Sequence, residues 1–193
     1  MRNSPGPIAV LFARKTSIYK TYPGLDVYDA DRDALNFTGS APVIAHPPCR
    51  AWGRLRAFAK PRIGEKELAL FAVDRVIENG GVLEHPTASS LFDYAGLPRP
   101  GERNEKGFTI QVNQHWFGHR AEKSTWLFIN GLDESQVPPA PLVFSEPTHV
   151  VAATHVSKRK GKKELSKAGR EATPPSFAEF LIEIAELVND CHR

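Results

Sequence analysis

Three short polar stretches of the sequence carry side chains that could do chemistry, and each follows a predicted buried strand. They are residues 29–31 (DAD), 46–50 (HPPCR) and 84–86 (EHP). The carboxyl ends of parallel strands meet at one edge of an open sheet, and ligands bind beyond that edge. We therefore expect the three stretches to surround one site. A thiol there could act as a nucleophile, and a carboxylic acid could exchange a proton with the substrate.

The stretch around Cys49 is predicted to be stiff, because Pro47 and Pro48 fix the backbone and remove two hydrogen-bond donors. A stiff turn suits a nucleophile that meets its substrate in one geometry. The neighbouring Arg50, or the start of a helix, is expected to favour the thiolate. Taken alone, a free cysteine is most often a small buried residue, and Glu84 could simply be a carboxylate near the start of a helix. Their positions at successive strand ends favour the catalytic interpretation.

The elements that would position these residues alternate between strands and helices. Short apolar runs predict buried strands, an apolar helical face predicts one long helix, and two further strands flank a polar stretch. The predicted strands are 8–12, 26–28, 42–45, 82–83, 107–112 and 125–129, and the predicted helix is 65–79. A last helix is expected to follow Thr173 as its cap, with Pro174 at its first position. This order predicts an α/β fold whose mostly parallel sheet carries helices on both faces.

The length and composition are those of one globular domain. The chain has 193 residues, of which 41% are hydrophobic and 24% charged. We expect a single domain over 1–193, with a proline-rich and basic connection at about 131–170 and a C-terminal helix at about 174–189. No apolar run is long enough to cross a bilayer, and no secretory signal is evident. Two cysteines make a poor disulfide framework, so a cytoplasmic location is predicted.

Positive charge is concentrated in one segment. Residues 155–170 contain seven Lys and Arg residues and a single Glu, whereas the net charge of the whole chain is only +3. Such a segment is either a solvated loop or a strip that contacts phosphates, and the sequence does not decide between the two.

The order of these pieces resembles the DNA cytosine-C5 methyltransferase family. Residues 47–49 (PPC) are similar to that family's nucleophile turn, with Arg50 where a glutamine is usual. The predicted helix 65–79 and the following 82–86 (VLEHP) resemble the family's helix and its Glu-Asn-Val motif. Glu84 then corresponds to the carboxylic acid that binds the ring nitrogen of cytosine.

Three further segments carry the same resemblance. Residues 108–131 resemble the segment that ends in the family's Gln-x-Arg-x-Arg strand, where Lys123 keeps the basic character of one position. Residues 27–31 (VYDAD) are similar to the acidic motif that holds the ribose of S-adenosylmethionine. Residues 173–185 resemble the last motif, a helix that returns to the cofactor site. The resemblance covers nearly the whole chain through short motifs, and it implies a Rossmann-like methyltransferase fold.

By this resemblance, the Cys49 thiolate attacks C6 of a pyrimidine, Glu84 holds the ring nitrogen, and C5 accepts a one-carbon group from S-adenosylmethionine. The implied partner is DNA, from which the base must leave the stack, or a pyrimidine nucleotide. Small phage-encoded proteins have a similar general appearance, which would suit a role in DNA modification. The expected site residues are Cys49, Glu84, Lys123 and Arg50 for catalysis; Phe12, Asp29, Asp31, Pro47 and Thr173 for the cofactor; and Arg14, Lys15, Lys158, Arg159, Lys160, Lys162 and Lys163 for nucleic acid.

The sequence also departs from the family's pattern. Residues 13–17 (ARKTS) replace the Gly-rich cofactor loop, and only a short stretch separates Asp31 from Pro42. Residues 133–167 are few for a target-recognition domain. Two other interpretations therefore stay open. One is a non-catalytic relative that binds nucleic acid or a partner protein; the other is an enzyme for a free nucleotide, gripped by basic residues of the 13–17 loop.

A metal site is the remaining alternative. His46, Cys49, His85, His115 and His119 could supply ligands, and the last two have the i, i+4 spacing of a helical pair. The glycine and aromatic residues between that pair make a helix doubtful there, and no two cysteines are closely spaced. We therefore predict no metal site and expect the histidines to be polar residues around the cavity.

Overall fold

The computed structural model describes residues 7–141, 143, 145–151 and 161–191, and its centre is a seven-stranded sheet. The strands lie in the order β2-β1-β3-β4-β7-β6-β5. Their bounds are β1 Ile8–Leu11, β2 Leu25–Tyr28, β3 Val43–Ala45, β4 Gly81–Pro86, β5 Arg103–Asn104, β6 Gly107–Asn113 and β7 Ser124–Asn130.

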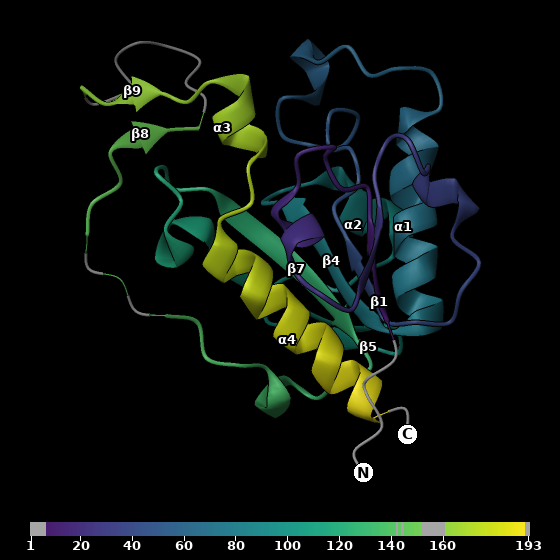
Figure 1. Ribbon diagram of the computed structural model, residues 1–193. Helices are drawn as coiled ribbons and strands as arrows, with labels where there is room; N and C mark the ends of the chain where they lie inside the picture. Colours follow the sequence, from purple (N-terminus) through teal and green to yellow (C-terminus); the bar gives the residue numbers. More distant parts are fainter. Residues whose placement is uncertain (1–6, 142, 144, 152–160, 192–193) are drawn as a thin grey trace.

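Helices and short 3-10 turns connect these strands (Figure 1). The α-helices are α1 Glu65–Asn79, α2 Ser90–Ala95, α3 Lys167–Glu171 and α4 Pro175–Cys191. The 3-10 turns are η1 Ile18–Thr21, η2 Ala34–Asn36, η3 Arg56–Phe58, η4 Gln114–Phe117 and η5 Glu134–Gln136. A separate pair of short parallel strands, β8 His149–Val150 and β9 Lys163–Glu164, lies near α3 at the top of Figure 1.

The sheet is mixed. β2, β1, β3 and β4 pair in parallel, whereas β4 with β7, β7 with β6, and β6 with β5 pair antiparallel. The α/β class is therefore confirmed, and the arrangement is compatible with the Rossmann-like fold that the resemblance implies. The expectation of a mostly parallel sheet holds for the N-terminal half only, because residues 107–130 fold back as a hairpin against β4.

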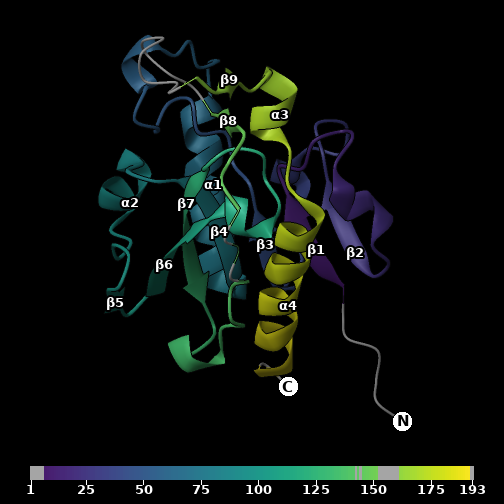
Figure 2. The ribbon, with the colours of Figure 1, turned by 90° about the vertical axis from the view of Figure 1, so that its left-hand side faces the viewer.

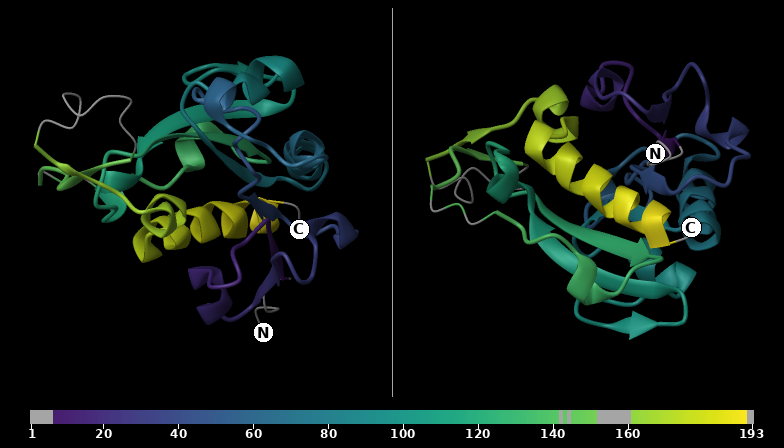
Figure 3. Two further views of the ribbon diagram at one scale, coloured as in Figure 1. Left: turned by 90° about the horizontal axis from the view of Figure 1, so that it is seen from above. Right: turned by 60° about the horizontal axis from the view of Figure 1, so that its bottom comes forward.

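Helices cover both faces of this sheet, as expected. Side chains alternate between the faces of a strand, so one set of sheet residues packs under α4 and the other under α1. On β4, for example, Val82 belongs to the core beneath α4 and Leu83 to the core beneath α1. Figure 2 shows α4 in front of the strands and α1 behind them. In the right-hand view of Figure 3, α4 lies between the N-terminal segment around η1 and strands β6 and β7.

Four predicted boundaries need correction. The last helix begins at Pro175, because the amides of Phe177 and Ala178 donate to the Pro174 carbonyl, so Thr173 lies one residue before the cap. Residues 84–86 belong to strand β4 rather than to a turn after it. The first strand ends before Phe12, whose φ of +62° leaves the extended region. The connection at about 131–170 is not featureless, since it contains η5, β8, β9 and the start of α3. No helix in the described chain is long and apolar enough to cross a membrane.

Candidate functional site

A cavity of about 760 Å³ lies at the carboxyl ends of the four parallel strands. Its walls come from the segments that follow β1, β2 and β3, from the end of β4, from the start of β7 and from α3. All three polar stretches predicted from the sequence contribute to it. The four predicted catalytic residues line the same cavity: Cys49, Glu84, Lys123 and Arg50.

The turn that presents Cys49 is held by its own backbone and by a buried tryptophan. The amides of Trp52 and Gly53 donate to the Cys49 carbonyl at 3.1 and 2.7 Å. Trp52 is only 2% exposed, and its indole N–H donates to the Lys66 carbonyl in α1. The thiol-bearing residue itself is exposed at the cavity. The stiffness expected from the two prolines is thus reinforced by anchoring to α1.

Arg50 secures the same turn rather than the thiol. Its Nε and one terminal nitrogen each donate to a carboxylate oxygen of Glu65, both at 2.7 Å. Glu65 is the first residue of α1, is buried, and also accepts from the Arg62 amide. A bidentate pair of this kind fixes geometry strongly and balances the arginine charge. Arg50 therefore ties the turn that bears Cys49 to the start of α1.

The surroundings of the Cys49 thiol raise its pKa rather than lower it. Burial of the sulfur in the cavity wall raises its pKa above the ordinary value, and the negative charge of Glu84 raises it further. Lys123 acts in the opposite direction but does not outweigh them. Arg50 was expected to favour the thiolate, and its charge does interact with Cys49, but the net shift of the Cys49 pKa is upward.

Glu84 is the most constrained side chain of the cavity. Like Val82 two residues earlier, it points to the α4 face of the sheet, and it is only 12% exposed. Its Oε1 accepts from Gln114 Nε2 at 3.0 Å, and its Oε2 lies 3.2 Å from His46 Nδ1. Burial alone would raise the pKa of Glu84, but the charge of Lys123 and the contact with His46 lower it to about 2. The carboxyl is therefore ionised.

His46 links Glu84 to a buried tyrosine. Its Nε2 lies 3.0 Å from the hydroxyl of Tyr19, which is 1% exposed. Burial raises the pKa of Tyr19 well above its usual value, as does the charge of Glu84. The hydroxyl thus stays protonated, and because an ionised carboxylate can only accept, His46 Nδ1–H donates to it. Tyr19, His46 and Glu84 form one hydrogen-bonded chain.

Gln114 holds the other oxygen of Glu84 and is itself held on its far side. It is 1% exposed, and its Nε2 also donates to Thr125 Oγ1 at 3.1 Å. The Thr125 hydroxyl donates in turn to the Lys123 carbonyl. The start of β7 and the turn before it therefore supply a second chain that converges on Glu84.

Sequence reasoning found Cys49, Glu84 and Lys123 but missed the residues that orient Glu84. Tyr19 and Gln114 were not singled out, and His46 was placed in the 46–50 stretch around the site but was given no role beyond a metal ligand or a polar residue of the cavity. The alternation of strand β3 could have placed His46 on the same face as Ile44. No local pattern marks Tyr19 or Gln114, because their partners lie 27 and 30 residues away in the sequence.

Four of the five predicted cofactor residues line the cavity: Phe12, Asp29, Pro47 and Thr173. The fifth, Asp31, is exposed and forms an ion pair with Lys15 at 2.6 Å. Phe12 adopts a left-handed backbone conformation that costs a non-glycine residue about 1 kcal/mol or more. The strain lies where the resemblance leads us to expect a Gly-rich loop.

Asp29 does not fit the role of ribose ligand that the resemblance implies. Its Oδ1 accepts from the amides of Asp31 and Arg32, and its Oδ2 accepts from Lys20 Nζ. These hydrogen bonds lower the pKa of Asp29 to about 2, and the residue is only 6% exposed. Three of its roughly four acceptor positions are already used. The carboxylate stabilises its own turn and has little left for two ribose hydroxyls.

The predicted nucleic-acid residues lie in different places. Arg14 lines the cavity, where it donates to the Ala168 carbonyl and lies 3.9 Å from Glu171, so it holds α3. Lys15 lies outside the cavity lining, as do the exposed Lys163 and its neighbour in sequence, Lys162. Lys158, Arg159 and Lys160 lie outside the described residues.

The described residues contain no group of three or more potential metal ligands. Both ring nitrogens of His115 face backbone carbonyls, those of His119 and Ser145, each at 2.7 Å. Those of His119 face the carbonyls of Ala121 and Gly169. The pair suggested by the i, i+4 spacing therefore organises the loop after η4 and its contact with α3.

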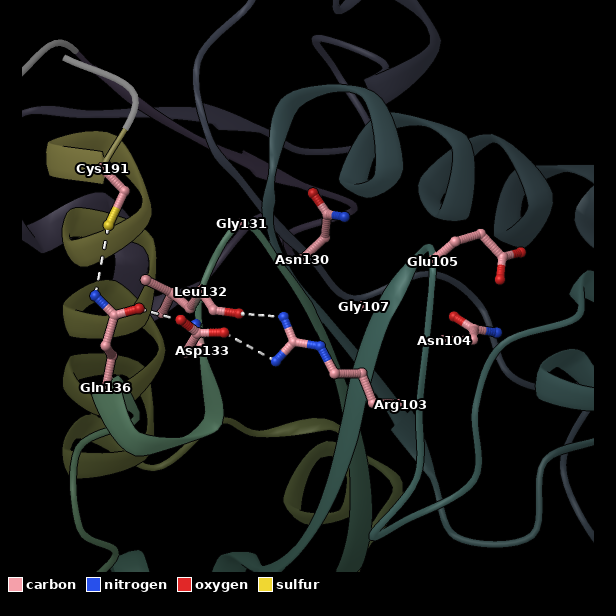
Figure 4. A pocket seen from close by; sticks show the side chains of 10 residues that line it. All are labelled: Arg103, Asn104, Glu105, Gly107, Asn130, Gly131, Leu132, Asp133, Gln136 and Cys191. Carbon is pink, nitrogen blue, oxygen red and sulfur yellow. Dashed lines mark hydrogen bonds and ion pairs between the residues drawn. The ribbon is translucent and has the colours of Figure 1, made fainter.

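A second, more open hollow of about 490 Å³ lies at the opposite end of the sheet (Figure 4). Its polar groups mainly satisfy one another. Arg103 pairs with Asp133 and the Leu132 carbonyl, while Gln136 donates to Cys191 Sγ. These contacts join β5 to η5 and the end of α4, so the polar side chains of this hollow stabilise the fold.

No model of a known protein family matches the sequence, and a search of curated proteins finds no significant match.

Proposed function

We propose that this protein modifies C5 of a pyrimidine, in DNA or in a nucleotide, through a covalent adduct between Cys49 and C6 of the ring. The observation that carries the proposal is the shared cavity: the thiol of Cys49, an ionised carboxylate and a lysine line one concave surface at the end of a sheet. A flat ring could contact all three at once. The methyltransferase fold and activity implied by the resemblance belong to this same proposal.

The chemistry begins with the thiolate. When Cys49 Sγ adds to C6, the C5–C6 double bond is lost and electron density moves to C5, which then attacks an electrophile. Loss of the C5 proton and elimination of the thiolate restore the ring. Lys123 is the residue that favours the thiolate, because its charge lowers the pKa of Cys49. Glu84 orients the ring through its remaining lone pairs.

The electrophile proposed from the resemblance is S-adenosylmethionine, which would supply a methyl group. Phe12, Pro47 and Thr173, which the resemblance assigns to the cofactor, line the cavity, but Asp29 has too few free acceptor positions to support the usual ribose contact. Calorimetric titration with S-adenosylmethionine tests this point separately. Saturable heat would support it as the donor, and no heat would point to a different donor.

The adduct can be tested without any donor. In D2O, reversible addition of Cys49 to C6 makes C5 exchange its proton for deuterium, which mass spectrometry detects as a gain in mass. We expect wild-type protein to catalyse this exchange on a pyrimidine oligonucleotide or nucleotide. Cys49→Ser should abolish it, whereas the matched control Cys191→Ser should not, since Cys191 lies at the other end of the sheet.

Absence of exchange on every pyrimidine substrate, by a folded protein, would refute the proposal. Mass spectrometry of nucleosides from cells that express the protein would then identify the group transferred, with Cys49→Ala as the control. A modified nucleoside that persists in the Cys49→Ala sample would exclude Cys49 as its source.

A further inference from the structure

We propose that the site is built for a pyrimidine that presents an N3–H donor, a uracil ring, rather than for the cytosine that the resemblance implies. This inference rests on the proposed function, because it concerns which ring Cys49 adds to. It follows from the direction of the hydrogen bonds that reach Glu84.

The first chain has a direction fixed by a backbone carbonyl. The Lys123 carbonyl can only accept, so the Thr125 hydroxyl donates its single proton to it. Thr125 Oγ1 must then accept from Gln114, which turns the amide nitrogen of Gln114 toward both Thr125 and Glu84. With the amide reversed, its oxygen would face two acceptors. Gln114 is therefore a donor to Glu84 Oε1.

The second chain has the same sense. Glu84 Oε2 belongs to an ionised carboxylate and can only accept, so His46 Nδ1 carries the hydrogen of this contact, and the hydroxyl of Tyr19 lies 3.0 Å from Nε2 on the other side of the ring. Each carboxylate oxygen thus receives one proton donor from the protein, and Lys123 adds a positive charge. Of roughly four lone-pair positions on the carboxylate, two remain, and both are acceptors. Glu84 offers the substrate acceptors and no proton.

Uracil and cytosine differ at the ring nitrogen that would meet this carboxylate. N3 of uracil carries a hydrogen and donates, whereas N3 of neutral cytosine is an acceptor with a lone pair. An ionised carboxylate facing that lone pair is repelled, even if the neighbouring amino group of cytosine donates to it. Cytosine would require a proton on Glu84, and the low pKa of this group opposes that.

The flow of charge during addition favours the same ring. When Cys49 adds to C6 of uracil, the ring double bond shifts to C4–C5 and the negative charge is held by O4. In cytosine the charge goes to N3, which must be protonated to hold it. The cavity supplies a cation, Lys123, but its carboxyl has no proton to give. An enolate oxygen is the group that this combination can stabilise.

The test compares two oligonucleotides that are identical except for deoxyuridine or deoxycytidine at one position, each incubated in D2O with wild-type protein. We expect deuterium to enter C5 of uracil about tenfold faster than C5 of cytosine, or more. Cys49→Ser gives the uncatalysed rate, which is subtracted. Equal or faster exchange on cytosine would overturn this inference and leave the proposed function intact, whereas no exchange on either ring would refute both.

A variant probes the cause of the preference. Gln114→Glu places a second carboxyl against Glu84, so the two must share a proton and one becomes a donor. We expect the ratio of uracil to cytosine exchange to fall in this variant. A folded Gln114→Glu protein with an unchanged ratio would show that the state of Glu84 does not select the ring. If the variant does not fold, the wild-type ratio decides alone.

Discussion

His85 allows a direct test of the burial of side chains on the α1 face of β4. It follows Glu84, so its ring points to the α1 face, where it is fully buried. Within the described structure neither ring nitrogen has a hydrogen-bond partner. Burial lowers the pKa of His85 from 6.5 to about 4, although the charge of Glu84 and the nearby Pro48 carbonyl oppose this.

The size and sign of the effect follow from the two pKa values. Because the folded-state value lies below the unfolded-state value, the unfolded chain binds the extra proton between about pH 6.5 and pH 4. The stability associated with neutral His85 is complete above about pH 6.5 and is lost as the pH falls toward 4. At 1.36 kcal/mol per unit, the shift corresponds to about 3 kcal/mol. His85→Leu should remove this loss. Neither ring nitrogen has a hydrogen bond of normal geometry, although the Pro48 carbonyl is near enough to affect the pKa, so the substitution should change stability near pH 7 by less than about 1.5 kcal/mol.

Urea unfolding followed by tryptophan fluorescence measures the free energy of unfolding of both proteins between about pH 7 and pH 4. The difference between wild type and His85→Leu should change by about 3 kcal/mol over that range. The charge of His85 also contributes to the lowered pKa of Glu84, but Glu84 loses stability only below about pH 4.5, so the change between pH 6.5 and 4.5 reports mainly on His85. If the free energy of unfolding of the two proteins changed with pH in parallel, the claim that His85 is buried and neutral would be refuted.

Three further outcomes are expected. Glu84→Gln, made in a Cys191→Ser background, should lower the pKa of Cys49 and speed its alkylation by iodoacetamide at neutral pH; an unchanged pH profile of alkylation would contradict the coupling of the two groups. Gly81→Ala should lower the free energy of unfolding by more than about 3 kcal/mol, measured by thermal or urea unfolding. The reason is that a Cβ at residue 81, whose φ is +119°, would lie 2.1 Å from the Val43 carbonyl oxygen. Near-wild-type stability would show that β3 and β4 can separate. Neutralising the basic segment should weaken DNA binding and flatten its salt dependence, and an unchanged salt slope would make the segment a solvated loop. The positions to neutralise are Lys158, Arg159, Lys160, Lys162 and Lys163.

Local patterns predicted the elements whose signals are local. The helix over 65–79 was predicted with the bounds that α1 has, because its apolar face is periodic and Gly64 and Gly80, both with positive φ, lie at its two ends. Two other local signals also predicted structure. The fully apolar run at the start of the chain indicated strand β1, and Pro47 and Pro48 indicated that β3 ends before them. These strands bring Cys49 and Glu84 to the same end of the sheet, as their order in the sequence implied.

The protonation states of Cys49 and Glu84 could not be predicted in the same way. A thiolate was expected from the neighbouring Arg50, but the arginine is bound to Glu65, fifteen residues away in the sequence. The ionised state of Glu84 depends on Lys123 and His46, which come from two other segments of the chain. Protonation follows from contacts between distant residues, and a pattern of neighbouring residues carries no information about them.

The direction of β7 explains why Lys123 belongs to the site. In a wholly parallel sheet, a residue just before a strand would lie at the amino end, far from the groups that follow the other strands. β7 instead runs antiparallel to β4, and its register pairs Thr125 with Pro86 and Asn130 with Gly81. The start of β7 therefore meets the end of β4, and Lys123 reaches Cys49 and Glu84. The same reversal delivers Gln114, because the turn that leads into β7 must lie at this end too. A site that needs a cation and an amide beside its carboxylate thus obtains both from one hairpin, and a change that loosened the β4–β7 pairing would disturb the thiol and the carboxylate together.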